Sequence, residues 1–379
     1  MTMQTPYYQY DMALLHETLD VAKTQASRYG YTIHYAVKAN ANPKLLKNIA
    51  SEGFGADCVS GNEIKVALRN GFKPHSIVFA GVGKTDGEIE YAIEQDIHCI
   101  HCESVQEFYV IEQIAQKLNK KVRVALRINP NVDAHTHKSI TTGLKDNKFG
   151  MSVSEANAIL NAENRNKNIE LIGLHFHIGS QILNMEVFKN LALEVNRIQE
   201  ELQSHWLPYL NLGGGLGIDY LNPTVNRVAN FSDYFQTIHK WLEPGRGQSI
   251  HFELGRSLVG QCGQLFTRVL YTKTAKSRNF AIVDAGMNAL IRPALYGAIH
   301  CIENISKIDY PANQTYDVVG PICETTDCFG EEVLLPATER GDLLVIHTCG
   351  AYAESMASDY NLRERPQCVF IPNYELEKT

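Results

Sequence analysis

The chain has 379 residues, of which 44% are hydrophobic and 20% are charged, so it can bury a full core in one large domain plus a smaller one. Its formal charge of −7 comes from dispersed acids and bases without a basic stripe, which argues against a nucleic-acid partner. No stretch has the length of a membrane span or the pattern of a secretory signal. We therefore expect a cytoplasmic protein with no membrane contact.

In chain order, short apolar runs alternate with amphipathic segments up to about residue 253. Strands are predicted at 32–37, 56–59, 76–80, 97–102, 122–128, 171–178, 209–212 and 249–253. Helices are predicted at 43–52, 62–70, 86–95, 105–118, 154–162, 185–202 and 231–241. This rhythm predicts an α/β fold, a TIM-like (β/α)8 barrel. A doubly wound sheet is the alternative, but no Gly-x-Gly-x-x-Gly follows the first strand.

Beyond residue 256 the pattern changes to short strands and turns with few helical segments. Strands are predicted at 265–271, 280–284, 314–319, 332–336, 342–347 and 367–371, and 7–10 is expected to add one more. The predicted organisation is therefore a barrel over 12–256 and a β-rich sandwich or barrel over 257–379, which the N-terminal segment 1–11 joins.

Lys38 ends the first predicted barrel strand, in the run Tyr-Ala-Val-Lys-Ala-Asn. An amine that emerges from a packed core is partly desolvated, which favours its neutral, nucleophilic form and suits reaction with an aldehyde. An ordinary surface lysine is the alternative interpretation, so the residues that follow the other strands decide between the two.

Polar and glycine residues follow several other strands at their carboxyl ends, where barrel enzymes carry their active sites. They are Asp57 and Ser60, Arg127 and Asn129, His175, His177 and Ser180, Gly213 to Gly215, and Glu253 to Arg256. We expect these groups to form one site with Lys38 at the mouth of the barrel.

Each cluster suits one part of a pyridoxal phosphate molecule. The backbone of Gly213 to Gly215 can approach a phosphate closely, and Gly255-Arg256 could close the same cup. His175 and His177 share one face of a strand, and an imidazole there can stack on a pyridine ring. A core histidine or a metal pair is the alternative; without a third ligand nearby in sequence, no metal is expected and stacking by His177 is favoured.

Glu253 indicates the type of reaction. A carboxylate at the pyridine nitrogen keeps that nitrogen protonated, so the ring can take up the electron pair left when carbon dioxide departs. A racemase would favour a cation at this position, and the glutamate therefore favours a decarboxylase. An ion pair with Arg256 is the structural alternative.

The nine cysteines form no paired framework, which predicts reduced thiols. Cys99 and Cys102 have C-x-x-C spacing, but no second pair follows at zinc-site spacing. We interpret this run as a core strand.

Four motifs together resemble the alanine-racemase-like (fold type III) pyridoxal phosphate decarboxylases: Tyr-Ala-Val-Lys-Ala-Asn, His-Ile-Gly-Ser-Gln, Leu-Gly-Gly-Gly-Leu-Gly and Glu-Leu-Gly-Arg. Within that superfamily, stretches 129–137 with 142–150, 292–300 and 350–356 resemble the diaminopimelate decarboxylases. The resemblance spans nearly the whole chain. It implies a barrel with a β-domain, pyridoxal phosphate as cofactor, and a homodimer whose active sites are shared between subunits.

The resemblance also implies a role for individual residues. Cofactor contacts fall on Lys38, Asp57, His177, Ser180, Gly214, Gly215, Glu253, Gly255, Arg256 and Tyr352. Substrate contacts fall on Arg256, Arg292, Tyr296, Glu324 and Tyr352, where the guanidinium groups suit carboxylates and Glu324 suits a distal ammonium. Lys38 and Cys323 are the catalytic pair, with Cys323 as proton donor to the carbanion.

The implied activity is decarboxylation of meso-diaminopimelate to L-lysine, the last step of lysine biosynthesis. A decarboxylase of ornithine, arginine or carboxynorspermidine would share the fold and Lys38 but should not need Arg292 and Glu324. A catalytically silent pyridoxal-binding homologue is the alternative outside the enzymes. The presence of Lys38, Glu253 and Cys323 together argues against it.

Overall fold

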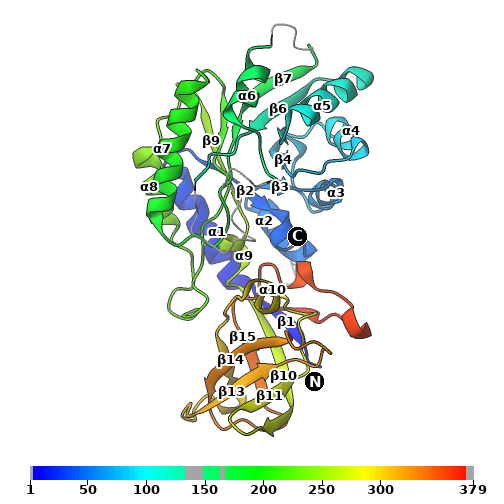
Figure 1. Cartoon of the computed structure of the whole chain (residues 1–379), viewed down its shortest axis with the longest axis vertical. Coiled ribbons are helices and arrows are strands. Elements are labelled where there is room, and N and C mark those ends of the chain that lie inside the picture. Colours follow the sequence, from blue (N-terminus) through cyan, green and yellow to red (C-terminus); the bar gives the residue numbers. More distant parts are fainter. Residues whose placement is uncertain (1–2, 133–147, 163–166, 373–379) are drawn as a thin grey trace, which may run out of the picture. The chain divides into compact units, whose positions relative to one another are not determined.

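The computed structural model describes residues 3–132, 148–162 and 167–372 (Figure 1). The chain separates into two compact units, and each is described by itself. One unit comprises Leu19–Gly217 and Asn230–Gly255, and the other comprises Met1–Thr18, Ile218–Ala229 and Arg256–Thr379. The 129–150 motif falls partly on residues 133–147, which lie outside the described residues.

The first unit is a closed barrel of eight strands in which every strand pairs in parallel with its neighbours. The strands are β2 (Thr32–Ala36), β3 (Gly55–Cys58), β4 (Ile77–Phe79), β5 (Cys99–Cys102), β6 (Val122–Arg127), β7 (Ile169–His175), β8 (Tyr209–Asn211) and β9 (Ser249–Leu254). The predicted (β/α)8 architecture is confirmed.

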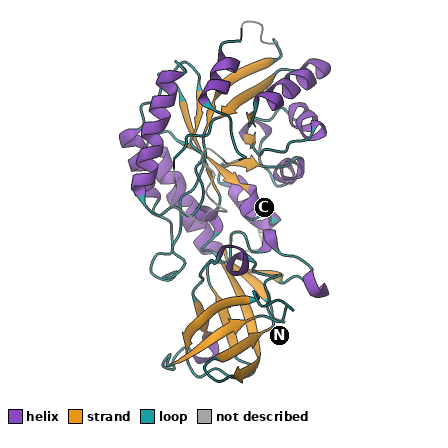
Figure 2. Cartoon of the chain, in the orientation of Figure 1, coloured by secondary structure: helices purple, strands orange, loops and turns teal. Residues whose placement is uncertain are grey.

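Helices connect the strands and lie outside them (Figure 2). They are α2 (Pro43–Ser51), α3 (Gly61–Arg69), α4 (Asp86–Glu94), α5 (Val105–Leu118), α6 (Val153–Leu160), α7 (Met185–Glu201) and α8 (Phe231–Trp241). A Ser, Thr or Asn side chain caps the N-terminus of each one. Because such a cap satisfies a free backbone N–H, it fixes where each loop from a strand ends and its helix begins. Helix α1 (Met12–Ser27), which precedes the barrel strands, was not among the predicted helices.

The strand register aligns polar residues at the mouth of the barrel. Arg127 pairs with His175, and His175 pairs with Asn211, on three neighbouring strands. Strand β2 lies between β3 and β9, where Ala36 pairs with Asp57 on β3 and Tyr35 pairs with Leu254 on β9. Parallel pairing therefore gathers residues that are far apart in sequence at the carboxyl ends of the strands.

The second unit is β-rich. Its strands are β1 (Tyr7–Asp11), β10 (Gly263–Thr274), β11 (Asn279–Val283), β12 (Ile302–Asn304), β13 (Gln314–Val319), β14 (Cys328–Leu335), β15 (Leu343–Ile346) and β16 (Gln367–Ile371). They form a sheet in the order β12-β15-β10-β11-β13-β14, with β1 paired to β10 and β16, so the predicted β-rich domain and its added N-terminal strand are confirmed. The short strand β12 and the helices α9 (Arg256–Val259) and α10 (Arg292–Tyr296) were not predicted.

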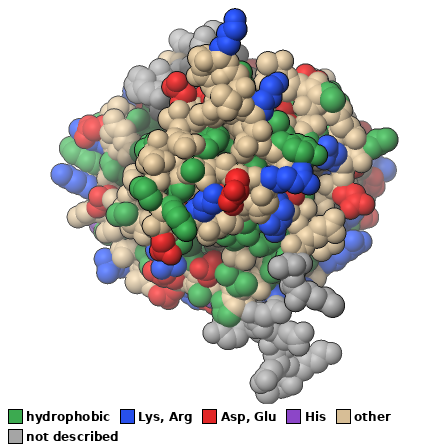
Figure 3. All heavy atoms as spheres, turned by 90° about the horizontal axis from the view of Figure 1, so that it is seen from below, with side chains coloured by type: hydrophobic (Ala, Val, Ile, Leu, Met, Phe, Trp, Pro, Cys, Tyr) green, Lys and Arg blue, Asp and Glu red, His purple; other side chains and the backbone are tan. Residues whose placement is uncertain are grey.

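None of the helices in the described ranges combines the length and the apolar character needed to cross a membrane. On the face drawn in Figure 3, acidic and basic side chains are interspersed. All nine cysteines are free thiols, and Cys99 and Cys102 are buried in β5, which confirms that this run is a core strand.

Candidate active site

A cavity of about 410 Å³ opens at the carboxyl ends of the barrel strands. The residues that line it are Lys38, Val59, Ala80, Gly81, Val82, Gly83, Arg127, Phe149, His175, His177 and Glu253. Three of the predicted cofactor residues, Lys38, His177 and Glu253, thus lie around one space within the barrel unit.

Lys38 follows β2 in a short 3-10 turn, Val37–Ala39, and its side chain is 37% exposed. Its Nζ donates to Oδ2 of Asp57 over 2.9 Å. Asp57 is fully buried on β3, and burial and the nearby Glu253 raise the pKa of its carboxyl while Lys38 opposes that change. The partial exposure leaves the amine open to an incoming aldehyde, and Asp57 fixes where the amine lies.

Glu253 is the most heavily supported group in the cavity. Its carboxylate accepts from Asn211 Nδ2 at 2.9 Å and contacts His175 Nε2 and His101 Nδ1, both at 3.1 Å. Burial would raise the pKa of this carboxyl, but His175 and His101 hold it well below its usual value. Glu253 is therefore a fixed carboxylate inside the barrel.

These partners also bear on metal binding. Ligand atoms of His101, His175 and Glu253 lie within 4.8 Å of one another. No third ligand was expected near His175 and His177 because His101 and Glu253 are far away along the chain. In the structure His175 Nε2 and His101 Nδ1 both lie 3.1 Å from Glu253 itself, so these two imidazoles pair with the carboxylate of their own cluster.

His177 and the glycine run lie next to each other at the rim. Gly214 N–H donates to His177 Nδ1 over 3.1 Å. Desolvation lowers the pKa of His177 to about 3, with a further contribution from Arg127, so the ring is neutral at physiological pH. A Cβ on Gly214 would lie 2.0 Å from the backbone oxygen of Glu253, which explains the need for glycine.

Arg127 forms part of the cavity wall, as expected of a polar residue at a strand end, although no cofactor or substrate contact was assigned to it. Its guanidinium binds Oε1 of Glu103 at 2.6 Å and lies 4.8 Å from the centre of the Phe149 ring. Glu103 also accepts from the backbone N–H of Gly81 and of Gly150. A polar residue at the end of a strand was the available sequence signal, and this ion pair holds together loops that border the cavity.

The second unit contains a separate cluster of cationic and aromatic groups. The guanidinium carbons of Arg256 and Arg292 lie 5.9 Å and 4.5 Å from the centre of the Tyr220 ring, and Arg256 also donates to Tyr220 OH at 2.6 Å. Arg292 Nη1 lies 2.9 Å from His300 Nε2, whereas its buried Nε has no hydrogen-bond partner among the described residues. A carboxylate could satisfy that donor.

Tyr352 contributes to the same cluster. Its ring centre lies 4.8 Å from the guanidinium carbon of Arg256, and its backbone has a φ of 57°. Bulky residues rarely adopt this left-handed conformation, which is found at functional sites where surrounding contacts enforce it. Tyr296, at the end of α10, is half-buried.

Cys323 and Glu324 lie elsewhere in the second unit, on the exposed loop between β13 and β14. The backbone N–H of Cys323 donates to Asn361 Oδ1 at 3.0 Å, and Tyr360 OH donates to Glu324 at 2.6 Å. Of the remaining predicted residues, Ser180 is half-buried after β7, Gly215 is half-buried in the loop that follows β8, and Gly255 is buried directly after β9.

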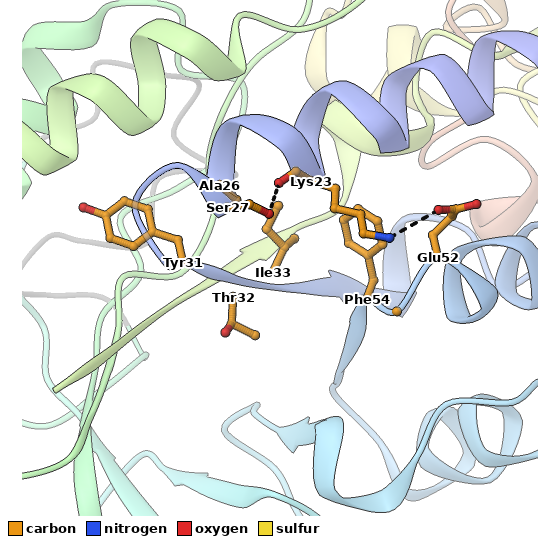
Figure 4. A pocket seen from close by; sticks show the side chains of 9 residues that line it. Lys23, Ala26, Ser27, Tyr31, Thr32, Ile33, Glu52 and Phe54 are labelled. Carbon is orange, nitrogen blue, oxygen red and sulfur yellow. Dashed lines mark hydrogen bonds and ion pairs between the residues drawn. The ribbon is translucent and has the colours of Figure 1, made fainter. Parts of the chain in front are cut away.

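A second hollow of the barrel unit, of about 180 Å³, lies at the start of β2 (Figure 4). Lys23 and Glu52 face each other across it at 3.6 Å, beside Tyr31 and Phe54. It adjoins the amino end of β2, whereas Lys38 follows the carboxyl end. Barrel enzymes place their chemistry at the carboxyl ends, so we assign no catalytic role to this hollow.

The cavity residues fit pyridoxal phosphate. Lys38 offers an amine, Glu253 a carboxylate, and His177 a neutral flat ring. Asp57 Oδ1 is buried without a hydrogen-bond partner among the described residues, and this acceptor is open to a further donor. The bare glycine backbone next to His177 allows close approach of an anion.

Related sequences and solved structures match nearly the whole chain. A family model described as pyridoxal-dependent decarboxylase, pyridoxal binding domain, matches residues 14–260. A diaminopimelate decarboxylase from Bacteroides thetaiotaomicron is 50% identical over 369 residues, which cover 97% of this chain and 95% of that protein. The chain belongs to the diaminopimelate decarboxylase family. Family membership also explains the two-part architecture, because the solved structures of the family share it.

Two of those structures illustrate the likeness. Diaminopimelate decarboxylase from Helicobacter pylori, complexed with L-lysine, superposes with a TM-score of 0.91 at 41% identity, covering 98% of this chain and 92% of that chain. The enzyme from M. jannaschii, also in complex with L-lysine, gives a TM-score of 0.88 at 34% identity, covering 97% and 87%. The structural likeness to these enzymes thus covers nearly the whole length of this chain.

Proposed function

We propose that this chain decarboxylates meso-diaminopimelate to L-lysine and carbon dioxide, with pyridoxal phosphate held by Lys38. The observation that carries the proposal is the barrel cavity, where the Lys38 amine, the Glu253 carboxylate and the neutral His177 ring line one space. Membership of the diaminopimelate decarboxylase family supports the substrate. A biosynthetic role of this kind agrees with the predicted cytoplasmic location.

The barrel residues would hold the cofactor. Lys38 would bind it covalently, Glu253 would hold a proton at its pyridine nitrogen, and His177 would lie against its ring. Gly214 and Gly215, with Ser180, Gly255 and the backbone of Arg256, would receive the phosphate. When bound, the cofactor supplies an electron sink for the electron pair released with carbon dioxide. Asp57 orients the Lys38 amine for attack and for its return.

Residues of the second unit would bind the substrate. Arg256 and Arg292, with Tyr296 and Tyr352, would grip its carboxylates, since a guanidinium forms paired hydrogen bonds with that group. The buried Nε of Arg292 supports this assignment, because it has no hydrogen-bond partner in the described part of the chain. Holding the departing carboxylate in a fixed direction contributes to catalysis because the entropy of orienting it is lost on binding and not in the reaction step. Glu324 would bind the distal ammonium, which a substrate with a second amino-acid centre requires.

Cys323 would deliver the proton that replaces the lost carboxylate. It lies with Glu324 on an exposed loop, and both side chains are accessible to another molecule. We propose that the protein is a homodimer and that this loop serves the barrel of the partner subunit, as a two-fold symmetric pair allows. When lysine is released, the Lys38 amine would bind the cofactor again.

A substrate panel tests the proposed activity. Purified protein loaded with pyridoxal phosphate should release carbon dioxide and L-lysine from meso-diaminopimelate, with much slower turnover of ornithine, arginine and carboxynorspermidine. Faster turnover of one of those three would reassign the substrate. Absence of turnover on the whole panel, with the cofactor bound, would indicate the catalytically silent homologue.

A further inference from the structure

The charge balance around Glu253 shows which groups can neutralise it. Lys38 and Arg127, the lysine and the arginine that line the cavity, are paired with other carboxylates: Lys38 with Asp57 at 2.9 Å, and Arg127 with Glu103 at 2.6 Å. A buried carboxylate without an opposite charge is costly. The positive charge that balances Glu253 must therefore lie on a group in direct contact with this carboxylate.

Two imidazoles touch Glu253, and their surroundings differ. His101 Nε2 lies 3.0 Å from Tyr209 OH, which can accept a hydrogen bond, while Nδ1 lies at ion-pair distance, 3.1 Å, from Glu253 Oε1 without hydrogen-bond geometry. A protonated His101 would thus have an acceptor at Nε2 and the opposite charge of Glu253 beside Nδ1. His175 reaches Glu253 through Nε2, but its buried Nδ1 has no hydrogen-bond partner among the described residues. A second proton on His175 would be buried without an acceptor, so the geometry places the charge on His101.

The direction of each pKa agrees with this assignment. Burial alone would lower the pKa of His101, but its neighbours Cys99 and Glu253 raise it to about 10. Burial lowers the pKa of His175 to about 3 despite the same carboxylate. The titratable groups that face His101 are Cys99 on β5, His175 on β7, Tyr209 on β8 and Glu253 on β9, with Asp57 on β3 and His34, His98 and His251 acting at longer range.

Building on the proposed function, we propose that His101 is a positioning residue that exchanges charge with the cofactor. It carries the counter-charge of Glu253 while the cofactor is absent, and it gives up one proton when a protonated pyridine nitrogen takes the other side of Glu253. Two positive charges beside one carboxylate repel each other, and this repulsion favours loss of the His101 proton.

Tyr209 and Asn211 make this exchange possible without breaking contacts. The N–H bond at His101 Nε2 breaks and its proton passes to solvent, while one proton is taken up at the pyridine nitrogen, so the total charge is unchanged. Asn211 Nδ2 donates to Tyr209 OH at 2.8 Å and occupies part of its accepting capacity. The hydroxyl proton can then turn toward the bare Nε2, and Nδ1–H still faces Glu253.

Nitrogen NMR of the full chain with 15N-labelled histidine tests the exchange directly. At pH 8, the His101 ring should give an imidazolium signal without cofactor and a neutral signal with pyridoxal phosphate. Loading with 1-deazapyridoxal phosphate, which has carbon in place of the pyridine nitrogen, should leave the imidazolium signal in place. A neutral His101 in the cofactor-free chain, or a charged one with pyridoxal phosphate, would overturn the proposal.

His101→Gln assigns the signal, because its spectrum should lack that ring alone; His101→Asn serves if the glutamine variant does not fold. His98→Gln is the matched control: His98 lies in the same barrel, 5.3 Å ring to ring from Tyr209, and should leave both His101 states unchanged. A chain that forms lysine normally but shows no change at His101 would defeat this inference alone. A chain that forms no lysine would defeat the proposed function whatever the state of His101.

Discussion

The two sets of proposed catalytic groups differ in how the chain holds them. In the barrel, Glu253 is buried and has three polar partners, and Lys38 is bound to Asp57. Cys323 and Glu324 are exposed on a loop, each held by one hydrogen bond to the short segment 360–361.

This contrast shows which parts of the site are organised within one chain. The barrel groups are preorganised by burial and by their neighbours, as an electrostatic site requires. The exposed loop gains such an environment only when another surface covers it. Substitutions in the barrel should therefore disable the chain that carries them, whereas loop substitutions should be correctable by a second chain.

Lys38→Ala should produce the largest loss, because it removes the group that would bind the cofactor covalently. We expect lysine formation to fall by roughly 10³-fold or more, as for loss of a covalent catalyst. The wild-type chain should be yellow, and borohydride reduction followed by peptide mapping should place the pyridoxyl label within residues 31–44. A label on another lysine would show that the cofactor assignment is wrong.

Glu253→Gln should come next, since it keeps the shape of the side chain but cannot hold the pyridine nitrogen protonated. A fall in kcat of roughly 10²- to 10⁴-fold is expected, typical of a lost proton-holding group. Asn211→Asp, a change at a supporting residue, should cost less. The decisive measurement is kcat with the cofactor shown to be bound; unchanged turnover in Glu253→Gln would remove this carboxylate from the mechanism.

The shared-site model gives the next prediction. Lys38→Ala and Cys323→Ala should each be nearly inactive alone, the second by roughly 10²- to 10⁴-fold if the thiol transfers a proton. Mixed in equal amounts under subunit exchange, half of the pairs would be mixed and each would have one intact site, so activity should return to roughly a quarter of wild type.

The control for that experiment is a mixture of Lys38→Ala with Glu253→Gln. Both defects lie in barrels, so the two sites of a mixed pair would each be damaged and no activity should return. If exchange is verified by mass and neither mixture recovers, Cys323 serves its own chain, and the contrast between barrel and loop loses its functional meaning.

Arg292→Lys should have a smaller effect, confined to substrate affinity. A lysine keeps the charge but loses the paired hydrogen bonds, and we expect KM to rise roughly 10- to 100-fold with little change in kcat. His300→Gln tests whether the contact at Arg292 Nη1 positions that guanidinium, and it should raise KM less. A change in kcat alone would indicate that Arg292 acts on the reacting atoms instead.

The sequence predicted the barrel and much of the cavity because strand ends are recognisable one at a time. Lys38, Asp57, His177 and Glu253 each follow an apolar run, and barrel closure brings all such ends together. Helix α1 and strand β12 were missed; β12 has only three residues, too few to establish a pattern.

The support of Glu253 could not be predicted in the same way. His101 was passed over inside a run interpreted as a core strand, and Tyr209 and Asn211 come from another strand more than a hundred residues away. Only the closed barrel places them beside Glu253. Alternation along β5 was the available signal, because it sets His101 on one face of the strand, but it does not say what that face meets.

The smallest predicted effect concerns pH and stability. Five histidines described in the barrel unit have pKa values lowered by burial: His34 and His98 to about 4, His175 and His177 to about 3, and His251 to about 2. In the unfolded chain they bind protons below about pH 6.5, whereas in the folded chain they stay neutral. The stabilisation that comes from these neutral histidines should therefore be complete above pH 6.5. The free energy of unfolding should fall progressively as the pH is lowered toward 4.

His251→Gln separates this effect from the acidic residues. His251 Nδ1 lies 2.9 Å from His34 Nε2. In His251→Gln, the free energy of unfolding from urea titrations should fall less between pH 6.5 and pH 4.5 than in the wild type, by roughly 1 kcal/mol or more. The half-buried His205 gives the matched control, and His205→Gln should follow the wild-type curve. Equal slopes in all three proteins would place the acid sensitivity outside the buried barrel histidines.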